Sequence, residues 1–437
     1  MAVPYNAPLD YSIAKLPAEL LVRIMRSGLD FSSQHSLSRV SRGFRDARLI
    51  VPEFWSTIVP KFPLREDQLQ YWSTSITNSG SAPLDIKLTI RDTTYGIDPT
   101  QGFLPLFLEL VVHVARWRTF VFVTDFPRTM KQFLTETMPV AVFPQLESLK
   151  LACAGSAFTR RAAWSALGDP GESSPVVPRL RDLALWNVWA CNPRGVLTDL
   201  VDLEITGDLI GISPPIKEIV AMLNSSPNLE TLSITILPPS LSCSPPPPTT
   251  NEPLRVVLPK LRSLTFRGSS RTAGVYILPL LHLPSLERLH LENSRAWTTV
   301  QAPEDYSSVI RIITQLNMPR PRPGDLFPVP PGPQWSHWKL KEVTLSWVMA
   351  AAEPLFEWLS FMHELATLRV RSSNLDPLRV LRDGKLCPLL QTLHVEGPVD
   401  SATRNELERV MRTRPDLDVF VEATPRGSNY TSRLPSY

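Results

Sequence analysis

Apolar residues recur with one spacing through the later two thirds of the chain. A leucine is followed three positions later by a second leucine (by Val343 in one copy), and two positions after that by another apolar residue. The first leucines of the copies are Leu146, Leu180, Leu200, Leu229, Leu261, Leu286, Leu340, Leu365 and Leu390. The last two apolar residues of each copy lie two apart, which is the spacing of side chains on one face of a strand. Each copy therefore predicts a short strand with one buried face.

Helical patterns precede several of these predicted strands. Ile216, Ile219, Val220 and Leu223 have the spacing i, i+3, i+4 and i+7 ahead of the Leu229 copy, and similar stripes occupy 355–362 and 378–381. Helix followed by strand, repeated, predicts an α/β fold in which parallel strands are joined by helical crossovers. Because only a neighbouring unit can cover the apolar face of each unit, we expect a solenoid over 143–421. A doubly wound α/β domain is the alternative, and the leucines are core residues in both.

Two proline-rich tracts interrupt the repeats, at 237–253 and 319–334. Proline-rich sequence favours polyproline II or irregular structure and does not join a sheet. We interpret both tracts as surface-loop insertions, with docking segments for a proline-binding domain as the alternative. The second tract lies in the longest interval between first leucines, 340 − 286 = 54 residues, which is about two repeats long.

The segments that flank the repeats also have clear periodicity. Over 84–90, apolar and polar residues alternate, which predicts a strand with one buried face. Helices are predicted at 66–75 and 105–115, and a further strand at 116–123, so 60–142 forms a lead-in. At the other end, Ser401–Arg412 predicts a helix with Ser401 as its N-cap, and Leu417–Val421 a last strand. We expect 1–15 and 422–437 to be a flexible leader and a disordered tail.

Residues 16–59 carry helical spacing instead. Leu20, Leu21 and Ile24 follow Pro17, which is tolerated in a first helical turn because its missing N–H would have no partner there. A second stripe, at i, i+3, i+7 and i+10, consists of Leu37, Val40, Phe44 and Ala47. Helices of this size cannot bury a core unaided. We therefore expect this module to depend on the rest of the chain, on a partner, or on both.

Composition narrows the function classes. The chain is 43% hydrophobic and 20% charged, as in globular proteins, and its formal charge of +3 is too small to indicate nucleic-acid binding. The N-terminus lacks the features of a secretory signal, and the most apolar stretch, 103–115, is too short to span a membrane. The four cysteines are far apart in sequence, which indicates free thiols. We therefore expect a cytoplasmic or nuclear protein without a membrane or nucleic-acid partner.

Catalytic and metal-binding motifs are absent from the sequence. It contains no phosphate-binding loop, dinucleotide fingerprint, nucleophile elbow or zinc-protease motif. Its seven histidines lack the cysteine or carboxylate spacing of a metal site. We expect no metal, no cofactor and no enzymatic activity. An enzyme with an unrecognised active site is the alternative, and a deep pocket with convergent polar groups would favour it.

The module at 16–59 resembles an F-box, the segment by which substrate receptors dock onto the adaptor subunit of a cullin–RING (SCF-type) ubiquitin ligase. The matching positions are Leu16, Pro17, Glu19, Leu20, Leu21, Ile24, Leu37, Val40, Ser41, Arg42, Phe44, Arg45, Pro52 and Trp55. The repeats resemble the irregular leucine-rich repeats of such receptors. The lead-in resembles that of the mushroom-type (basidiomycete) fungal F-box proteins at Trp72, Ser79-Gly80, Pro83-Leu84, His113 and Arg116-Trp117-Arg118.

This resemblance implies a non-enzymatic substrate receptor that binds the adaptor, and through it the cullin, by its F-box. The residues implied to contact the adaptor are Leu16, Pro17, Leu20, Leu21, Ile24, Val40, Phe44 and Trp55. A target protein would bind the repeats or their insertions. Trp335 and Trp338, beside the second proline-rich tract, are candidate target contacts because tryptophan is frequent in binding hot spots. The alternative is a non-catalytic repeat scaffold whose F-box is vestigial or serves outside a ligase.

Overall fold

The computed structural model describes most of the repeat strands and the segments between the insertions. The described residues are 16–26, 42–91, 102–134, 142–153, 177–188, 198–207, 216–236, 256–268, 277–293, 305–317, 339–371, 376–397 and 400–423. Val40, Trp335, Trp338 and both proline-rich tracts lie outside them. So do the leader at 1–15 and most of the expected tail. Glu422 belongs to the last strand, so the ordered structure runs past the boundary expected from sequence.

The described chain is an α/β structure built on one parallel sheet of 13 strands, whose order follows the sequence. The strands of this sheet are β1 Thr57–Ile58, β2 Leu84–Ile90, β3 Trp117–Thr124, β4 Ser148–Cys153, β5 Asp182–Trp186, β6 Asp202–Gly207, β7 Thr231–Ile236, β9 Ser263–Gly268, β11 Arg288–Asn293, β12 Glu342–Ser346, β13 Thr367–Arg371, β14 Thr392–Gly397 and β15 Asp418–Ala423. Two further strands, β8 (Val256–Val257) and β10 (Leu281–His282), form a separate parallel pair.

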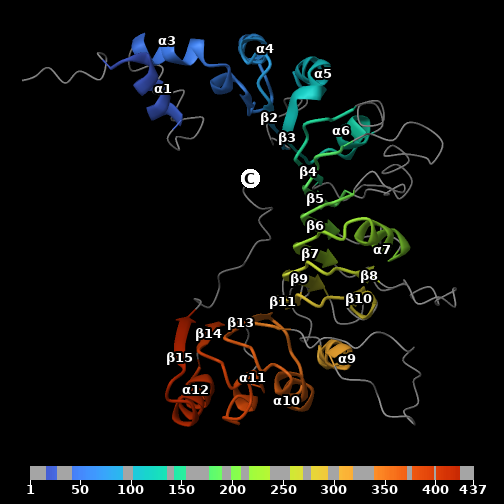
Figure 1. Ribbon diagram of the computed structural model, residues 1–437, viewed down its shortest axis with the longest axis vertical. Coiled ribbons are helices and arrows are strands. Elements are labelled where there is room, and N and C mark those ends of the chain that lie inside the picture. The colour runs from blue at the N-terminus through green and yellow to red at the C-terminus, as the bar shows by residue number, and fades with distance from the viewer. Residues whose placement is uncertain are drawn as a thin grey trace, which may run out of the picture.

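Helices cover one side of this sheet. They are α4 Glu66–Asn78, α5 Phe103–Val112, α6 Pro127–Gln132, α7 Ile216–Asn224, α9 Ser307–Asn317, α10 Ala352–Ser360, α11 Asp376–Val380 and α12 Ser401–Thr413. The stack curves so that the strands line the inner side of the arc and the helices lie outside (Figure 1). At its N-terminal end are α1 (Ala18–Arg26), α3 (Arg42–Ile50) and the 3-10 helix η2 (Pro52–Trp55). No helix in the described segments is long and apolar enough to cross a membrane.

A repeated backbone turn leads into the strands. The N–H of the first leucine donates to the carbonyl three residues earlier, as from Leu229 to Ser226 (3.2 Å) and from Leu286 to Leu283 (3.4 Å). The next residue along donates to its equivalent in the preceding unit. This ladder runs without a break through Arg118, Glu147, Arg181, Val201, Glu230, Arg262, Glu287, Lys341, Ala366, Gln391 and Asp418. Backbone hydrogen bonds thus fix the register of each unit on its neighbour.

The core lies between the sheet and the helices. Each first leucine in the sequence pattern is 7% exposed or less, and the two strand positions that follow it are also buried. The alternation predicted over 84–90 is confirmed, because the side chains of Leu84, Ile86, Leu88 and Ile90 are all buried. The strand residues between these positions point to the inner side of the arc.

Some elements differ from the sequence-based expectations. The interval between Leu286 and Leu340 holds no further strand of the sheet among described residues, because β11 pairs directly with β12. This interval is a long crossover that contains α9. The last helix has Asp400 as its N-cap rather than Ser401, since the Asp400 carboxylate accepts from the N–H of Thr403 at 2.7 Å.

Candidate functional site

The helical module has a small core of its own. Leu21, Phe44, Ala47, Val51 and Phe54 form a buried cluster, against which Leu16 and Val22 pack. This cluster is separate from the main core of the sheet. Residues from α1, α3 and the loop into η2 therefore hold one another, as the helical stripes in the sequence require.

Apolar side chains also remain outside this core. Leu20 and Ile24 lie one turn apart on α1 and are 45% and 39% exposed, whereas Leu21 is 2% exposed. Pro17 is exposed, and its carbonyl accepts the N–H groups of Leu20 and Leu21 at 3.0 and 3.2 Å. Pro17 therefore fixes the start of α1, and the side chains of Leu20 and Ile24 on the next turns remain partly exposed.

The structure divides the predicted adaptor-contact residues into two groups. Pro17, Leu20 and Ile24 are exposed and Leu16 is half-buried, while Leu21, Phe44 and Trp55 are buried. Phe44 is 3% exposed and fills the module's interior, because the inward face of a short helix must pack against something. Trp55 ends η2, which contacts α3, α4 and β1 and so joins the module to the sheet.

A second apolar stripe lies on α5. Leu104, Leu108 and Val112 occur at i, i+4 and i+8 and are all exposed. The lead-in residues near this helix have structural roles instead. Arg116 donates from Nη2 to Ser79 Oγ (2.5 Å) and from Nε to the carbonyl of Ala82 (3.0 Å), which ties the turn before β2 to the start of β3.

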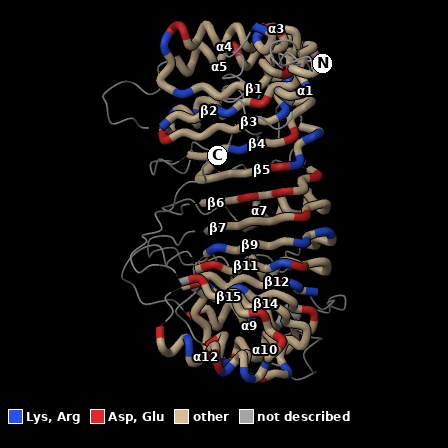
Figure 2. The backbone as a smooth tube through the Cα atoms, turned by 90° about the vertical axis from the view of Figure 1, so that its left-hand side faces the viewer, with Lys and Arg blue, Asp and Glu red and all other residues tan. Residues whose placement is uncertain are grey.

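The inner side of the arc differs between its two ends. Near the N-terminal end, Val121, Val123, Ala152 and Trp186 form an apolar cluster on the strand face away from the main core. Toward the C-terminal end, charged residues of both signs occupy the corresponding positions. Figure 2 shows lysine, arginine and carboxylate positions spread over the strands of this side.

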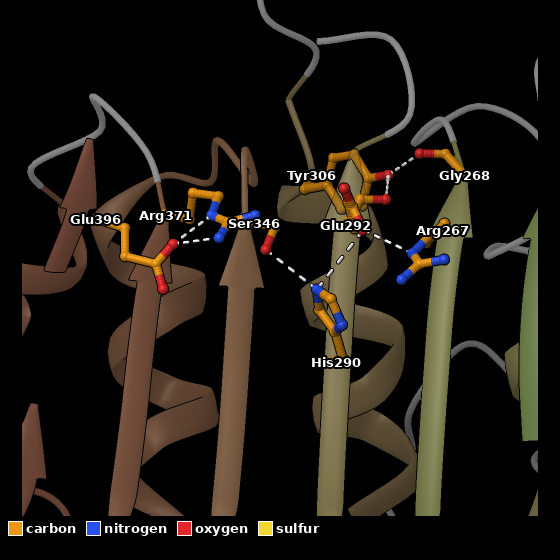
Figure 3. A network of polar contacts seen from close by, with 8 residues as sticks. All are labelled: Arg267, Gly268, His290, Glu292, Tyr306, Ser346, Arg371 and Glu396. Carbon is orange, nitrogen blue, oxygen red and sulfur yellow. Dashed lines mark hydrogen bonds and ion pairs between the residues drawn. The ribbon is translucent and has the colours of Figure 1, made fainter. Parts of the chain in front are cut away.

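A network of polar contacts crosses strands β9 to β14 (Figure 3). Arg267 Nε donates to Glu292 Oε2 at 2.7 Å, and Arg371 Nε donates to Glu396 Oε2 at 2.6 Å. Glu292 is only 5% exposed, so its carboxylate requires such a partner. The network therefore couples adjacent strands through charge-assisted hydrogen bonds.

Tyr306 lies in the crossover that contains α9 and contacts the ends of strands β9 and β11. Its buried hydroxyl donates to the carbonyl of Gly268 and lies 3.3 Å from that of Glu292. Its N–H donates to the carbonyl of Met349 at 2.6 Å. One residue thus connects the ends of β9 and β11 to the segment after β12.

His290 is the titratable centre of the network. Burial, reinforced by the positive charges of Arg267 and Arg371, lowers the pKa of His290 to about 4. The ring is therefore neutral at pH 7, and its contact with Glu292 (3.7 Å) is not an ion pair there. Its sequence position already carried a signal, because His290 lies between Leu289 and Leu291 and strand alternation directs it to the inner side.

Serine, histidine and glutamate together suggest a proton relay, but the geometry does not form one. Both Ser346 Oγ (3.1 Å) and Glu292 Oε2 (3.7 Å) approach the same ring atom, Nε2 of His290. A relay requires the hydroxyl and the carboxylate on opposite ring nitrogens. The arrangement therefore joins strands rather than relaying a proton.

Among the described residues, cysteine and metal chemistry add no further site. Cys153 and Cys387 are both buried, whereas Cys191 and Cys243 lie outside the described residues. Burial raises the pKa of Cys387 to about 12, so it is not a thiolate at neutral pH. Among the residues that the structure describes, no group of histidine, cysteine and carboxylate side chains could hold a metal ion.

No protein-family model matches the chain, and no curated protein matches its sequence.

Proposed function

We propose that this protein is a substrate receptor of a cullin–RING ubiquitin ligase, with residues 16–59 as its F-box and the following units as a leucine-rich-repeat solenoid. The observation that carries the proposal is the apolar turn of Leu20 and Ile24, which stays exposed beside a filled interior. Apolar side chains at i and i+4 on a short helix suit a helix-in-groove contact. The adaptor would cover them, and the cullin would be recruited through the adaptor.

The solenoid interpretation draws support from the continuous backbone ladder and from the turn that recurs at most of the first leucines. Units that share one turn, one strand and one ladder contact are typical of solenoids. In this proposal the inner side of the arc contacts the target protein. Ubiquitin transfer takes place on other subunits, and this chain supplies proximity.

The test is co-purification of the full chain with the adaptor and cullin. The double variant Leu20→Glu/Ile24→Glu places two charges in the proposed contact and should weaken adaptor binding more than about tenfold. Both side chains are exposed, so the variant should remain folded. The matched control is Leu108→Glu, which changes an exposed leucine of α5 in the same way and should bind the adaptor normally. Equal binding by all three proteins would refute the F-box assignment.

A protein-interaction scaffold outside any ligase is the second candidate. The burial of Leu21, Phe44 and Trp55 favours it, because three of the residues named for the adaptor then serve internal packing. The same experiment separates the two functions. A receptor brings down both adaptor and cullin, whereas a scaffold with a vestigial F-box brings down neither, or the adaptor alone.

A further inference from the structure

Within the part of the chain that the structure describes, the C-terminal end of the sheet is an open edge. Strand β15 pairs with β14 in parallel register and is the last strand in the sheet order among described residues. It lies at the end of the arc in Figure 1. Unpaired edge strands offer backbone donors and acceptors to any extended chain that approaches them.

The backbone groups that face the edge can be identified. Asp418 N–H donates to the carbonyl of Gln391 at 2.9 Å, so the groups of Asp418 point toward β14. In a parallel strand, successive residues direct their N–H and C=O groups to alternate sides. The N–H and C=O groups of Val419 and Val421 therefore point away from β14, toward the open side of β15.

The row of apolar side chains in the core continues into β15, where no further described strand covers it. Val419 and Val421 are in register with Leu393 and Val395 of β14, both of which are buried. Val421, in contrast, is 45% exposed. An additional strand with apolar side chains opposite these valines would bury them as β15 buries the row of β14.

The inner face of β15 has the opposite chemistry. Asp418 and Glu422 flank Phe420, which is 52% exposed and stacks on His394 with ring centroids 4.9 Å apart. Glu422 is in register with Glu396, whose carboxylate is already bound by Arg371. A strand added outside β15 would relieve this run of carboxylates if it carried cations opposite Asp418 and Glu422. A cation between them would lie over Phe420.

The same charges argue against a second copy of this chain at the edge. In a two-fold antiparallel pairing of β15 centred on Phe420, Asp418 of each copy would face Glu422 of the other. Like charges directly opposite on paired strands are destabilising. In that register a partner with basic residues fits where a second β15 does not.

We propose that β15 receives an added β-strand from a partner protein, an extended segment in which apolar side chains alternate with lysine or arginine. The apolar residues extend the core row at Val419 and Val421, and the basic residues face Asp418 and Glu422. Because the two carboxylates are placed symmetrically about Phe420, the added strand can run either parallel or antiparallel to β15 with basic residues opposite both carboxylates. The proposal does not depend on the F-box assignment.

The probe is a fluorescein-labelled peptide of alternating valine and lysine, with a valine–glutamate peptide of equal length as its counterpart. Fluorescence polarisation with the full chain should give saturable binding of the lysine peptide only. Glu422→Lys should weaken that binding about three- to tenfold, because an attraction becomes a repulsion. The matched control is Glu408→Lys on α12, which makes the same charge change at an exposed site and should leave binding unchanged.

A second variant tests the backbone contact. Val421→Pro removes an N–H that faces the open edge while leaving the ladder to β14 intact, and proline is tolerated on such edges. It should abolish peptide binding, and circular dichroism will show whether it is folded. In the unmodified chain, the peptide should slow hydrogen exchange at Val419 and Val421.

Three results would each overturn the proposal. One is a lysine peptide that fails to bind, and another is binding that is indifferent to Glu422→Lys. The third is an unmodified chain that sediments as a dimer and becomes a monomer on Val421→Pro substitution, because a second copy would then occupy the edge.

Discussion

The helical module at 16–59 and the parallel sheet use apolar residues in opposite ways. In the sheet, the first leucine of every copy of the sequence pattern is buried, since each strand covers the apolar row of its neighbour. In the module, Leu21 and Phe44 are buried while Leu20 and Ile24 remain exposed. In a long stack of strands and helices, neighbouring units bury most of the apolar side chains. Two short helices that pack together can bury only the side chains on the faces that they share. The exposed turn that carries Leu20 and Ile24 is therefore the contact that we propose for the adaptor.

The largest expected effect is a difference in stability between a substitution in the sheet and one in the helical module. Leu286→Ala removes a fully buried side chain of the stack and should lower the free energy of unfolding by about 2–5 kcal/mol. Leu20→Ala, at an exposed position, should change it by less than about 0.5 kcal/mol. Urea unfolding followed by circular dichroism measures both. If Leu20→Ala cost as much as Leu286→Ala, the apolar turn of α1 would be core, and the comparison would fail.

A smaller effect concerns the polar network of the sheet. The pKa of His290 in the folded chain is about 4, below its usual 6.5, so the unfolded chain takes up this proton first as pH falls. The stability that neutral His290 contributes is complete above pH 6.5 and is lost progressively toward pH 4. Between pH 7 and pH 5 the unmodified chain should lose about 1–2 kcal/mol more than His290→Gln does.

The His290→Gln variant is the reference for the unmodified chain, because the two proteins contain the same carboxylates and differ only at one titrating ring. Unfolding by urea at the two pH values gives the comparison. Equal losses would mean that the ring is accessible to protons, and that the network lies open on the inner side rather than packed between strands.

The repeat pattern predicts most of the fold because its signal is local. Alternation places the strands, and the turn at most of the first leucines follows from the same residues. The interval before Leu340 was misleading, because length alone does not distinguish a missing repeat from a long crossover such as the one containing α9. Asp400 replaces Ser401 as the cap because a difference of one residue at a helix end depends on side-chain geometry.

The candidate sites were harder to predict from the sequence than the fold was. Leu20 and Leu21 are adjacent and chemically identical, and only the position of α3 decides which one is covered. Alternation assigns Arg267, Glu292 and Arg371 to the inner side. Their contacts depend on the register between strands that are distant in sequence, which no single repeat contains. Val40, Trp335 and Trp338 remain predictions, because they lie outside the described residues.

Hydrogen exchange of the full chain, with and without the purified adaptor, tests directly whether the exposed turn of α1 is the adaptor contact. We expect slower exchange along α1, around Leu20 and Ile24, and unchanged exchange along α5, although α5 also exposes an apolar stripe. Slower exchange along α5, or no change anywhere within 16–59, would show that the adaptor does not bind at α1.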